Sequence, residues 1–468
     1  MLQGTGSTML RGIDQALARI AARLGIEPRT LNIGLFVLCV GVGLNLAFMT
    51  LLHVPTTLIG TFDFFRLDLG NDSWWPIRAA ARVISVEPQV PVYTTTIFGL
   101  QSKFQYPPTS LFLLQPIIAA EDLIHRSAAI FKASCWGAAL ATIILMAWVF
   151  PRCLALGNGR ATPLGRRDRV VLAAVAAVAT LTFHPIVTAV SLGQVQTWIN
   201  FLFCAAVFSW VSGRKDWAGV LTAVICLIKP QLLLFLPWAA VRKEWRFIWY
   251  FAVPFCLISL ISVFVYGLED WSDYLELLSY VSKRGETFFP NQSVNGLLNR
   301  LFHNGNNLVW QEAAYAPYNF WIYIATSVSS AVIIALAILW RRHEHERAPG
   351  MDFLVAGLSF TMASPIAWHH HYGAMLPMFA LALPATLSAR GLGAGSLVVL
   401  AVSYVLSSTL FDVTNRLADT PFNVLQSYIF FGAVVLLVHL YRLRHVQYVE
   451  RRAPVPELIE AQTATIGA

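Results

Sequence analysis

Residues 225–236 read ICLIKPQLLLFL, an apolar run interrupted by one lysine, Lys229, and by the proline that follows it. Proline lacks an amide donor and disfavours helical geometry in the residue before it, so a helix is expected to break at this dipeptide. A lysine facing lipid at membrane depth would be costly. The run therefore predicts a broken helix whose cation meets a protein-lined cavity, where it binds a ligand or, alternatively, pairs with a structural counter-ion.

The composition around this run is that of a multispanning membrane protein. The chain of 468 residues is 57% hydrophobic and 12% charged, with a mean hydropathy of +0.61, well outside the range of soluble domains. The net charge of +8 comes from short basic clusters between apolar segments, which fits the positive-inside rule better than a nucleic-acid partner. The six cysteines lie in or beside apolar segments without CxxC spacing, so neither a disulfide framework nor a zinc site is predicted.

The apolar segments predict an all-α polytopic fold. Residues 1–31 read as an amphipathic cytoplasmic lead-in, and the first span covers 32–53. Ten further apolar segments follow, at 129–150, 170–183, 195–212, 217–241, 247–266, 318–340, 353–367, 373–388, 395–411 and 424–441. The basic clusters between them are expected to be cytoplasmic.

The segment 217–241 carries basic pairs at both ends, 214–215 and 242–243. A single crossing would place these pairs on opposite faces, whereas a hairpin that turns at Lys229 keeps every cluster inside. Counting the hairpin as two arms gives about 12 transmembrane helices in a membrane domain over 32–441, with a cytoplasmic tail at 442–468. The first outer loop is then 54–128, which includes a short interfacial or re-entrant helix at 107–120, and a large outer loop covers 267–317.

Polar residues concentrate in the predicted outer elements. The first loop holds Asp63, Asp68 and Asp72, and a later turn holds His184, Gln194 and Gln196. The large loop holds Asn291, Gln292, Asn295 and Arg300, and SPIAWHHHYG places three histidines at another turn. Adjacent histidines do not share one helix face, so they are expected to donate hydrogen bonds to an anion rather than to form a metal site.

The order of these motifs resembles glycosyltransferase family 87. The resemblance covers about residues 33–440 and rests on YPP before an apolar helix, GQV opening a span, the IKPQ break, NQSVNGL, and SPIAWHHHY. It implies a GT-C membrane enzyme, similar to polyprenyl-phosphate-mannose-dependent mannosyltransferases. Such an enzyme moves one sugar from a polyprenyl-phosphate donor to a lipid or glycan acceptor on the extracytoplasmic side of the cell (inner) membrane, by an inverting, metal-independent route.

The resemblance also assigns roles to residues. The family's first-loop aspartate, the general base, matches Asp72 or Asp63, and its lysine-proline break matches Lys229. His370 and His371 match its histidine pair, which with Lys229 would bind the donor phosphate. The expected substrate-binding set is Gln194, Asn291, Gln292, Tyr106 of the YPP motif and Arg300.

The residue types agree with this chemistry, because a leaving phosphate needs cations and a reacting hydroxyl needs a carboxylate to take its proton. No DxD-like pair, GxGxxG or P-loop is present, so no metal, cofactor or nucleotide donor is expected. The expected partners are the sugar donor, the acceptor and membrane lipids. Which sugar is moved stays open, with mannose as the family-level guess. The alternative is a transporter or flippase of a lipid-linked sugar, since broken helices with a cation at the tip also bind transported substrates.

Overall fold

The computed structural model describes residues 12, 15–51, 53, 57–67, 69–87, 89–118, 126–157, 164–312, 314–340, 350–389 and 391–452. Within these ranges the chain is helical, and the extended pairing is limited to an isolated bridge between Asn291 and Trp368. The all-α class predicted from the sequence is confirmed for this part of the chain.

The first half of the chain contains a helical segment at 15–24 followed by the elements named here. They are α2 (Pro28–Phe36), η1 (Val37–Gly43), α3 (Leu44–Leu51), α4 (Thr57–Arg66), α5 (Trp74–Val86), α6 (Val92–Thr94), η2 (Thr95–Gly99), α7 (Pro108–Ile118), α8 (Arg126–Gly157), α9 (Arg166–Leu181), α10 (His184–Ser191), α11 (Gln196–Val211) and α12 (Lys215–Ile228). The segments η1 and η2 are π-helical.

The second half begins at the break after Ile228. Its elements are η4 (Pro230–Leu234), α13 (Phe235–Val241), α14 (Trp245–Arg284), α15 (Val294–Leu301), α16 (Phe320–Leu339), α17 (Met351–Met362), η5 (His369–Ala374), α18 (Met375–Ser388), α19 (Ala394–Ser408), η6 (Asp412–Leu417), η7 (Pro421–Ser427) and α20 (Tyr428–Arg452). Here the η segments are 3-10 helices.

Several of these helices can cross a membrane. Among the described residues, five are long and apolar enough: Pro28–Leu51, Ser127–Ala155, Trp245–Arg284, Phe320–Leu339 and Pro421–Gln447. A sixth candidate is the pair α9 and α10, which bend by 60° at their junction. Shorter apolar helices, among them α11, α17 and α19, complete the bundle. The chain is therefore an all-α membrane protein, and the count of about 12 spans stays a prediction.

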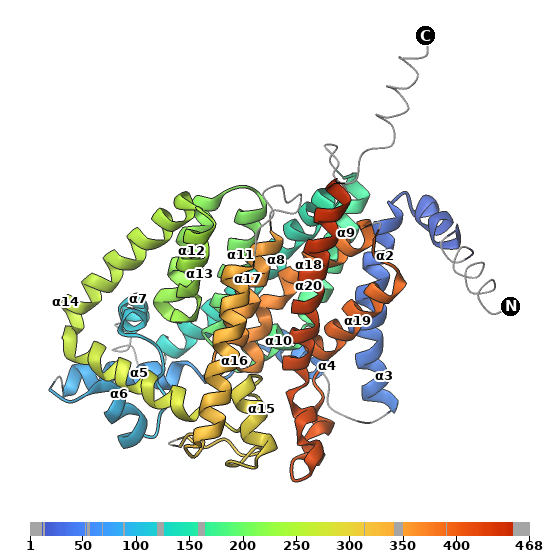
Figure 1. Cartoon of the computed structure of the whole chain (residues 1–468). Coiled ribbons are helices and arrows are strands. Elements are labelled where there is room, and N and C mark those ends of the chain that lie inside the picture. Colours follow the sequence, from blue (N-terminus) through green and yellow to red (C-terminus); the bar gives the residue numbers. More distant parts are fainter. Residues whose placement is uncertain are drawn as a thin grey trace.

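The hairpin predicted at Lys229 is confirmed. The ammonium of Lys215, at the start of α12, pairs with the carboxylate of Glu244 just after α13, and Arg246 donates to Asp216 at 3.1 Å. Both ends of the segment therefore lie together, and the chain reverses between them. Figure 1 shows α14 running along the outer side of the hairpin, where it packs against both α12 and α13.

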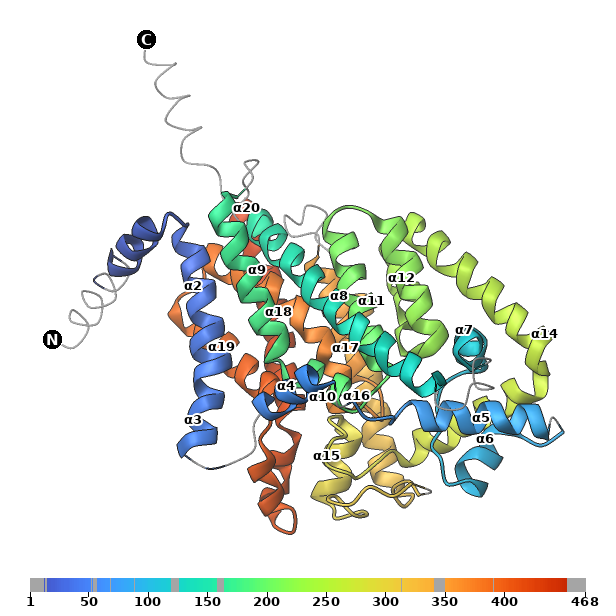
Figure 2. The ribbon, with the colours of Figure 1, turned by 180° about the vertical axis from the view of Figure 1, so that it is seen from behind.

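The predicted outer loops contain more helix than the sequence suggested. The first of them, 54–128, carries α4, α5, α6 and α7, and α7 lies where the short helix at 107–120 was predicted. The loop after the bend at Thr182 is instead the short helix α10. The large loop also begins as helix, because α14 continues to Arg284 across a kink at Gly267, where φ is +81°. Figures 1 and 2 show α5, α6 and α15 gathered at one end of the bundle.

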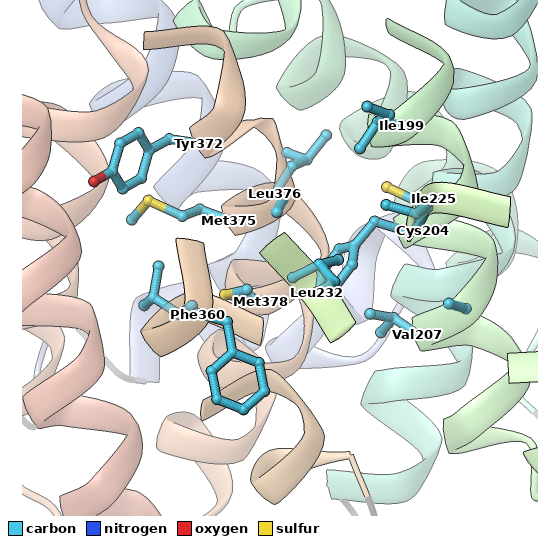
Figure 3. Packing of buried hydrophobic residues seen from close by; sticks show 14 of the residues in the cluster. Ile199, Cys204, Val207, Ile225, Leu232, Phe360, Tyr372, Met375, Leu376 and Met378 are labelled. Atoms are coloured by element: carbon cyan, nitrogen blue, oxygen red, sulfur yellow. The ribbon is translucent and has the colours of Figure 1, made fainter. Parts of the chain in front are cut away.

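The apolar core extends from this end, where it includes Trp74 and Tyr93, into the bundle. Figure 3 shows buried side chains of α11, α12, α17 and α18 interleaved around Leu232 of η4. Deeper along the hairpin, Phe235 stacks on Phe353 with ring centroids 4.5 Å apart, and Trp210 stacks on the same ring at 4.8 Å. Ring pairs of this kind bury large apolar areas, so the hairpin is held firmly against α11 and α17.

Candidate active site

The lysine of the broken hairpin lies in a polar network. Its backbone is extended (φ −140°, ψ 111°), which ends α12 and begins η4. The Nζ atom of Lys229 lies 3.0 Å from Oε1 of Gln196 and 2.7 Å from Nε2 of His371, and 5.7 Å from the centre of the Tyr106 ring. An ammonium only donates, so Nε2 of His371 accepts and its ring proton lies on Nδ1. The lysine is thus held by neutral groups.

A carboxylate lies on the other side of this network. Gln194 donates from Nε2 to Oδ2 of Asp72, while its Oε1 accepts from Ser73 Oγ at 2.6 Å. Ser73 also lies 2.8 Å from the hydroxyl of Tyr106, so its hydroxyl joins the carboxylate side to the ring that Lys229 faces. Gln194, in the turn before α11, and Gln196, the first residue of α11, therefore fix Asp72 and Lys229 in one site.

The surroundings of Asp72 adjust its acidity. Its side chain stays accessible to solvent, yet the protein on its other sides removes enough hydration to raise the pKa of the carboxyl. The hydrogen bond from Gln194 and the charge of Lys229 oppose that rise. A solvent-accessible carboxylate with a raised pKa is suited to take a proton from a substrate hydroxyl.

Close backbone contact places this carboxylate. The turn before α5 packs on the turn between α10 and α11, where the amide of Gly70 donates to Ser191 at 2.8 Å and the amide of Asp72 to Leu192 at 3.0 Å. Gly193 adopts φ +64°, and a Cβ on it would lie 2.0 Å from the carbonyl oxygen of Gly70. Glycine is needed here both for the left-handed conformation and for the space.

The three histidines of η5 are all buried, and they have different neighbours. Nδ1 of His369 lies 3.3 Å from Nε2 of His184. Nε2 of His370 and Nδ1 of His371 have no hydrogen-bond partner among the described atoms. Buried ring nitrogens without partners are unusual in proteins, and here they flank Lys229, so they are available to a bound anion. The described residues hold no group of three or more His, Cys, Asp or Glu side chains arranged to bind a metal ion.

Comparison with known protein families decides the class of the chain. A model described as glycosyltransferase family 87 matches residues 104–365, more than half of the 468 residues. The chain belongs to glycosyltransferase family 87. The matched range includes Tyr106, Gln194 and Lys229, whereas Asp72 and the histidine turn lie outside it. The assignment of those two elements to the site of this glycosyltransferase rests on geometry.

A curated relative belongs to the same class. It is a polyprenol-phosphate-mannose-dependent alpha-(1-2)-phosphatidylinositol mannoside mannosyltransferase from Mycobacterium tuberculosis, 23% identical over 292 residues. The alignment covers 60% of this family 87 chain and 62% of the relative's length. No solved structure matches the chain.

Two residues expected to bind substrate in this glycosyltransferase form hydrogen bonds to its own backbone. Asn291 donates to the carbonyl of Glu286 at 2.8 Å and accepts from the amide of Ala367 at 2.9 Å. Gln292 donates to the carbonyl of Gln426 at 2.7 Å. The bond from Ala367 joins this segment to the residues before η5, and the bond to Gln426 joins it to η7. Asn291 and Gln292 therefore support the histidine turn. Direct binding of substrate by them stays a prediction.

Arg300 also forms hydrogen bonds within the family 87 chain itself. Its guanidinium is fully buried, and it donates to the carbonyl of Asn291 at 3.0 Å and to Ser427 Oγ at 2.6 Å. It therefore ties α15 to the end of η7. A role in substrate binding remains a prediction for this residue too.

The alternative base, Asp63, is a residue of α4, but its side chain is outside the described part of the structure. The whole of Asp68 is also outside it. The sequence-based set omitted two members of the network, Ser73 and Gln196. Gln196 could have been found from its place two residues after Gln194 at the start of an apolar helix. Ser73 could not, because only the folded chain shows that its hydroxyl reaches Tyr106.

Proposed function

We propose that this family 87 glycosyltransferase moves a single sugar from a polyprenyl-phosphate donor to a lipid or glycan acceptor. The observation that carries the proposal is the juxtaposition of Asp72 and Lys229 through Gln194 and Gln196. It supplies a carboxylate for the acceptor hydroxyl and a cation for the donor phosphate within one polar site.

The chemistry follows from these groups. The acceptor hydroxyl oxygen attacks the anomeric carbon of the donor sugar, and its proton passes to the carboxylate of Asp72. The bond between the anomeric carbon and the phosphate oxygen breaks, and the phosphate leaves with the bonding electron pair. Lys229 and a nitrogen of His370 or His371 donate to the leaving oxygens, whose negative charge grows as the bond breaks. Attack from the face opposite the phosphate inverts the anomeric configuration.

The donor is proposed to carry mannose. The relative from Mycobacterium tuberculosis is named as dependent on polyprenol-phosphate-mannose, and the apolar helices beside Lys229 offer a surface for a prenyl chain. We propose that the chain lies in the cell (inner) membrane with its site on the extracytoplasmic side. The basis is that the basic connections between α11 and α12 and between α13 and α14 lie at the end of the bundle opposite α5, α6 and α15. Gln194 and Tyr106 are proposed to contact the substrates there.

The test is a reaction with the purified full-length protein in nanodiscs. A panel of polyprenyl-phosphate sugars, including the mannose donor, is added with a phosphatidylinositol mannoside acceptor. A transferase releases free polyprenyl phosphate and forms a larger glycolipid, and both products are measured by mass spectrometry. Donor that crosses proteoliposomes uncleaved, with no glycolipid formed from any member of the panel, would instead indicate the transporter.

A further inference from the structure

A second cavity lies away from the polar network, between α2 and α9. Its volume is about 570 Å³, within the range of small-molecule sites. Apolar side chains, including Leu35, Leu38 and Val175, form most of its lining, and Thr30, Arg166 and Arg167 form the polar part. Figure 2 shows α2 and α9 side by side along the edge of the bundle.

The cavity opens to the outside of the bundle. Leu38, Leu35 and Val170 line it and are each more than a third exposed. Both flanking helices belong to candidate membrane spans. Apolar residues exposed on a spanning helix face hydrocarbon in the membrane, so the mouth of the cavity is open to lipid rather than to water.

The charge at one end of the cavity is positive. Residues 15–31 and 164–175 together hold six arginines and two carboxylates, Glu27 and Asp168. The carboxylate of Asp168 accepts the amide of Glu27 at 2.7 Å and so joins the start of α2 to α9. The two arginines that line the cavity, Arg166 and Arg167, belong to this excess of positive charge.

A surface helix adjoins the same end. The helical segment 15–24 carries Arg19 and Arg23 and leaves Ile20 and Leu24 about half exposed, and Leu24 also lines the cavity. Exposed apolar residues beside arginines are typical of a helix that lies in the headgroup region of a membrane. The basic end of the cavity is therefore expected at the depth of lipid headgroups.

We propose that this cavity binds an anionic phospholipid of the surrounding membrane. Arg166 and Arg167 hold the phosphate of the headgroup, and one acyl chain lies along Leu35, Leu38 and Val175 in the groove between α2 and α9. Basic pockets between membrane helices commonly bind anionic headgroups. None of the residues proposed for sugar transfer lines this cavity, so the site is separate from the proposed activity.

The test measures lipid binding to the full-length protein, purified in detergent, by native mass spectrometry. Palmitoyl-oleoyl phosphatidylglycerol is titrated against the phosphatidylcholine with the same chains. We expect one bound phosphatidylglycerol and at least about tenfold weaker binding of phosphatidylcholine. The double variant R166Q/R167Q should lose at least about tenfold in affinity for phosphatidylglycerol, since each basic residue near an anionic headgroup adds to binding.

Matched variants make the result specific. R214Q/K243Q removes the same charge from exposed positions outside the cavity and should leave binding unchanged. Gly34 lines the cavity, so G34L fills it and should abolish binding with both arginines present, whereas G137L adds leucine at an open helix position elsewhere and should not. Equal affinity for the two lipids, equal losses in the two charge variants, or binding that survives G34L would overturn the proposal. If R166Q/R167Q does not fold, G34L against G137L decides.

Discussion

Asp72 and Lys229 are the two charged residues of the proposed site, and each is held in place by uncharged neighbours. Gln194 bonds to the carboxylate, and Gln196 and His371 bond to the ammonium. The two charges attract each other across the network without a direct ion pair in the described contacts.

The first prediction concerns the base. The variant Asp72→Asn keeps the shape of the side chain but cannot take a proton, so transfer should fall by roughly 10²- to 10⁴-fold while donor binding is largely kept. Turnover and donor affinity are measured on the same purified variant. Asp63→Asn is the matched control and should stay active. Normal turnover by Asp72→Asn together with an inactive Asp63→Asn would move the base to α4.

The second prediction concerns pH. A general base acts when ionised, so the rate should rise as the pH increases through the pKa of Asp72. Because the protein surroundings raise that pKa, the midpoint should lie above the value of about 4 that is usual for aspartate. The pH profile of kcat/KM locates it. Residual activity of Asp72→Asn should lack this acidic limb, and a limb that persists unchanged belongs to another group.

The third prediction concerns the cation. Lys229→Met removes the charge and keeps the apolar length, so it should weaken donor binding and slow cleavage together, by roughly 2–4 kcal/mol. His371→Ala should act in the same direction and more mildly. Donor affinity and melting temperature are measured side by side. Unchanged affinity with a lowered melting temperature that Asp72→Asn restores would show that Lys229 is a structural counter-ion.

At the scale of elements, the contact between the turn before α5 and the turn before α11 controls the site. The fourth prediction is that Gly193→Ala lowers transfer strongly, because a Cβ would push against Gly70 and the left-handed backbone would add about 1–2 kcal/mol of strain. Gly137→Ala, at an open position of a helix, is the control for the same substitution. Wild-type activity of Gly193→Ala would show that the turns can separate without harm.

The helical class and the hairpin at Lys229 could be predicted from the sequence. The reversal at Lys229 follows from local chemistry and from the charge pairs at both ends, and both are visible in the printed residues. The partners of Asn291 and Arg300 within the fold could not be predicted, because Ala367 and Ser427 lie far away in the sequence and only the folded chain brings them within reach. The role of Ser73 could not be predicted for the same reason, because its neighbours Tyr106 and Gln194 come from distant segments.

At the scale of the whole molecule, the arrangement in the membrane can be tested directly. The fifth prediction uses single cysteines in a chain without its six native ones, labelled in intact cells with an impermeant thiol reagent. Gln311→Cys, in the large outer loop, should be labelled, and Arg214→Cys, at the basic end, should react only after the membrane is opened. Both positions are exposed in the folded chain. The opposite pattern would reverse the proposed orientation.

The spacing of the network along the chain affects its biosynthesis. A ribosome delivers Asp72 and Gln196 before Lys229, whereas His371 emerges 142 residues after Lys229. At bacterial or eukaryotic elongation rates of about 5–20 residues per second, that interval lasts roughly 7–28 s. During it, the nascent chain holds a lysine in an apolar segment whose last partner has not yet been made. Of the residues that contact or face this charge in the folded chain, Gln196, Tyr106 and Asp72 are already made during the interval, and His371 joins them only later.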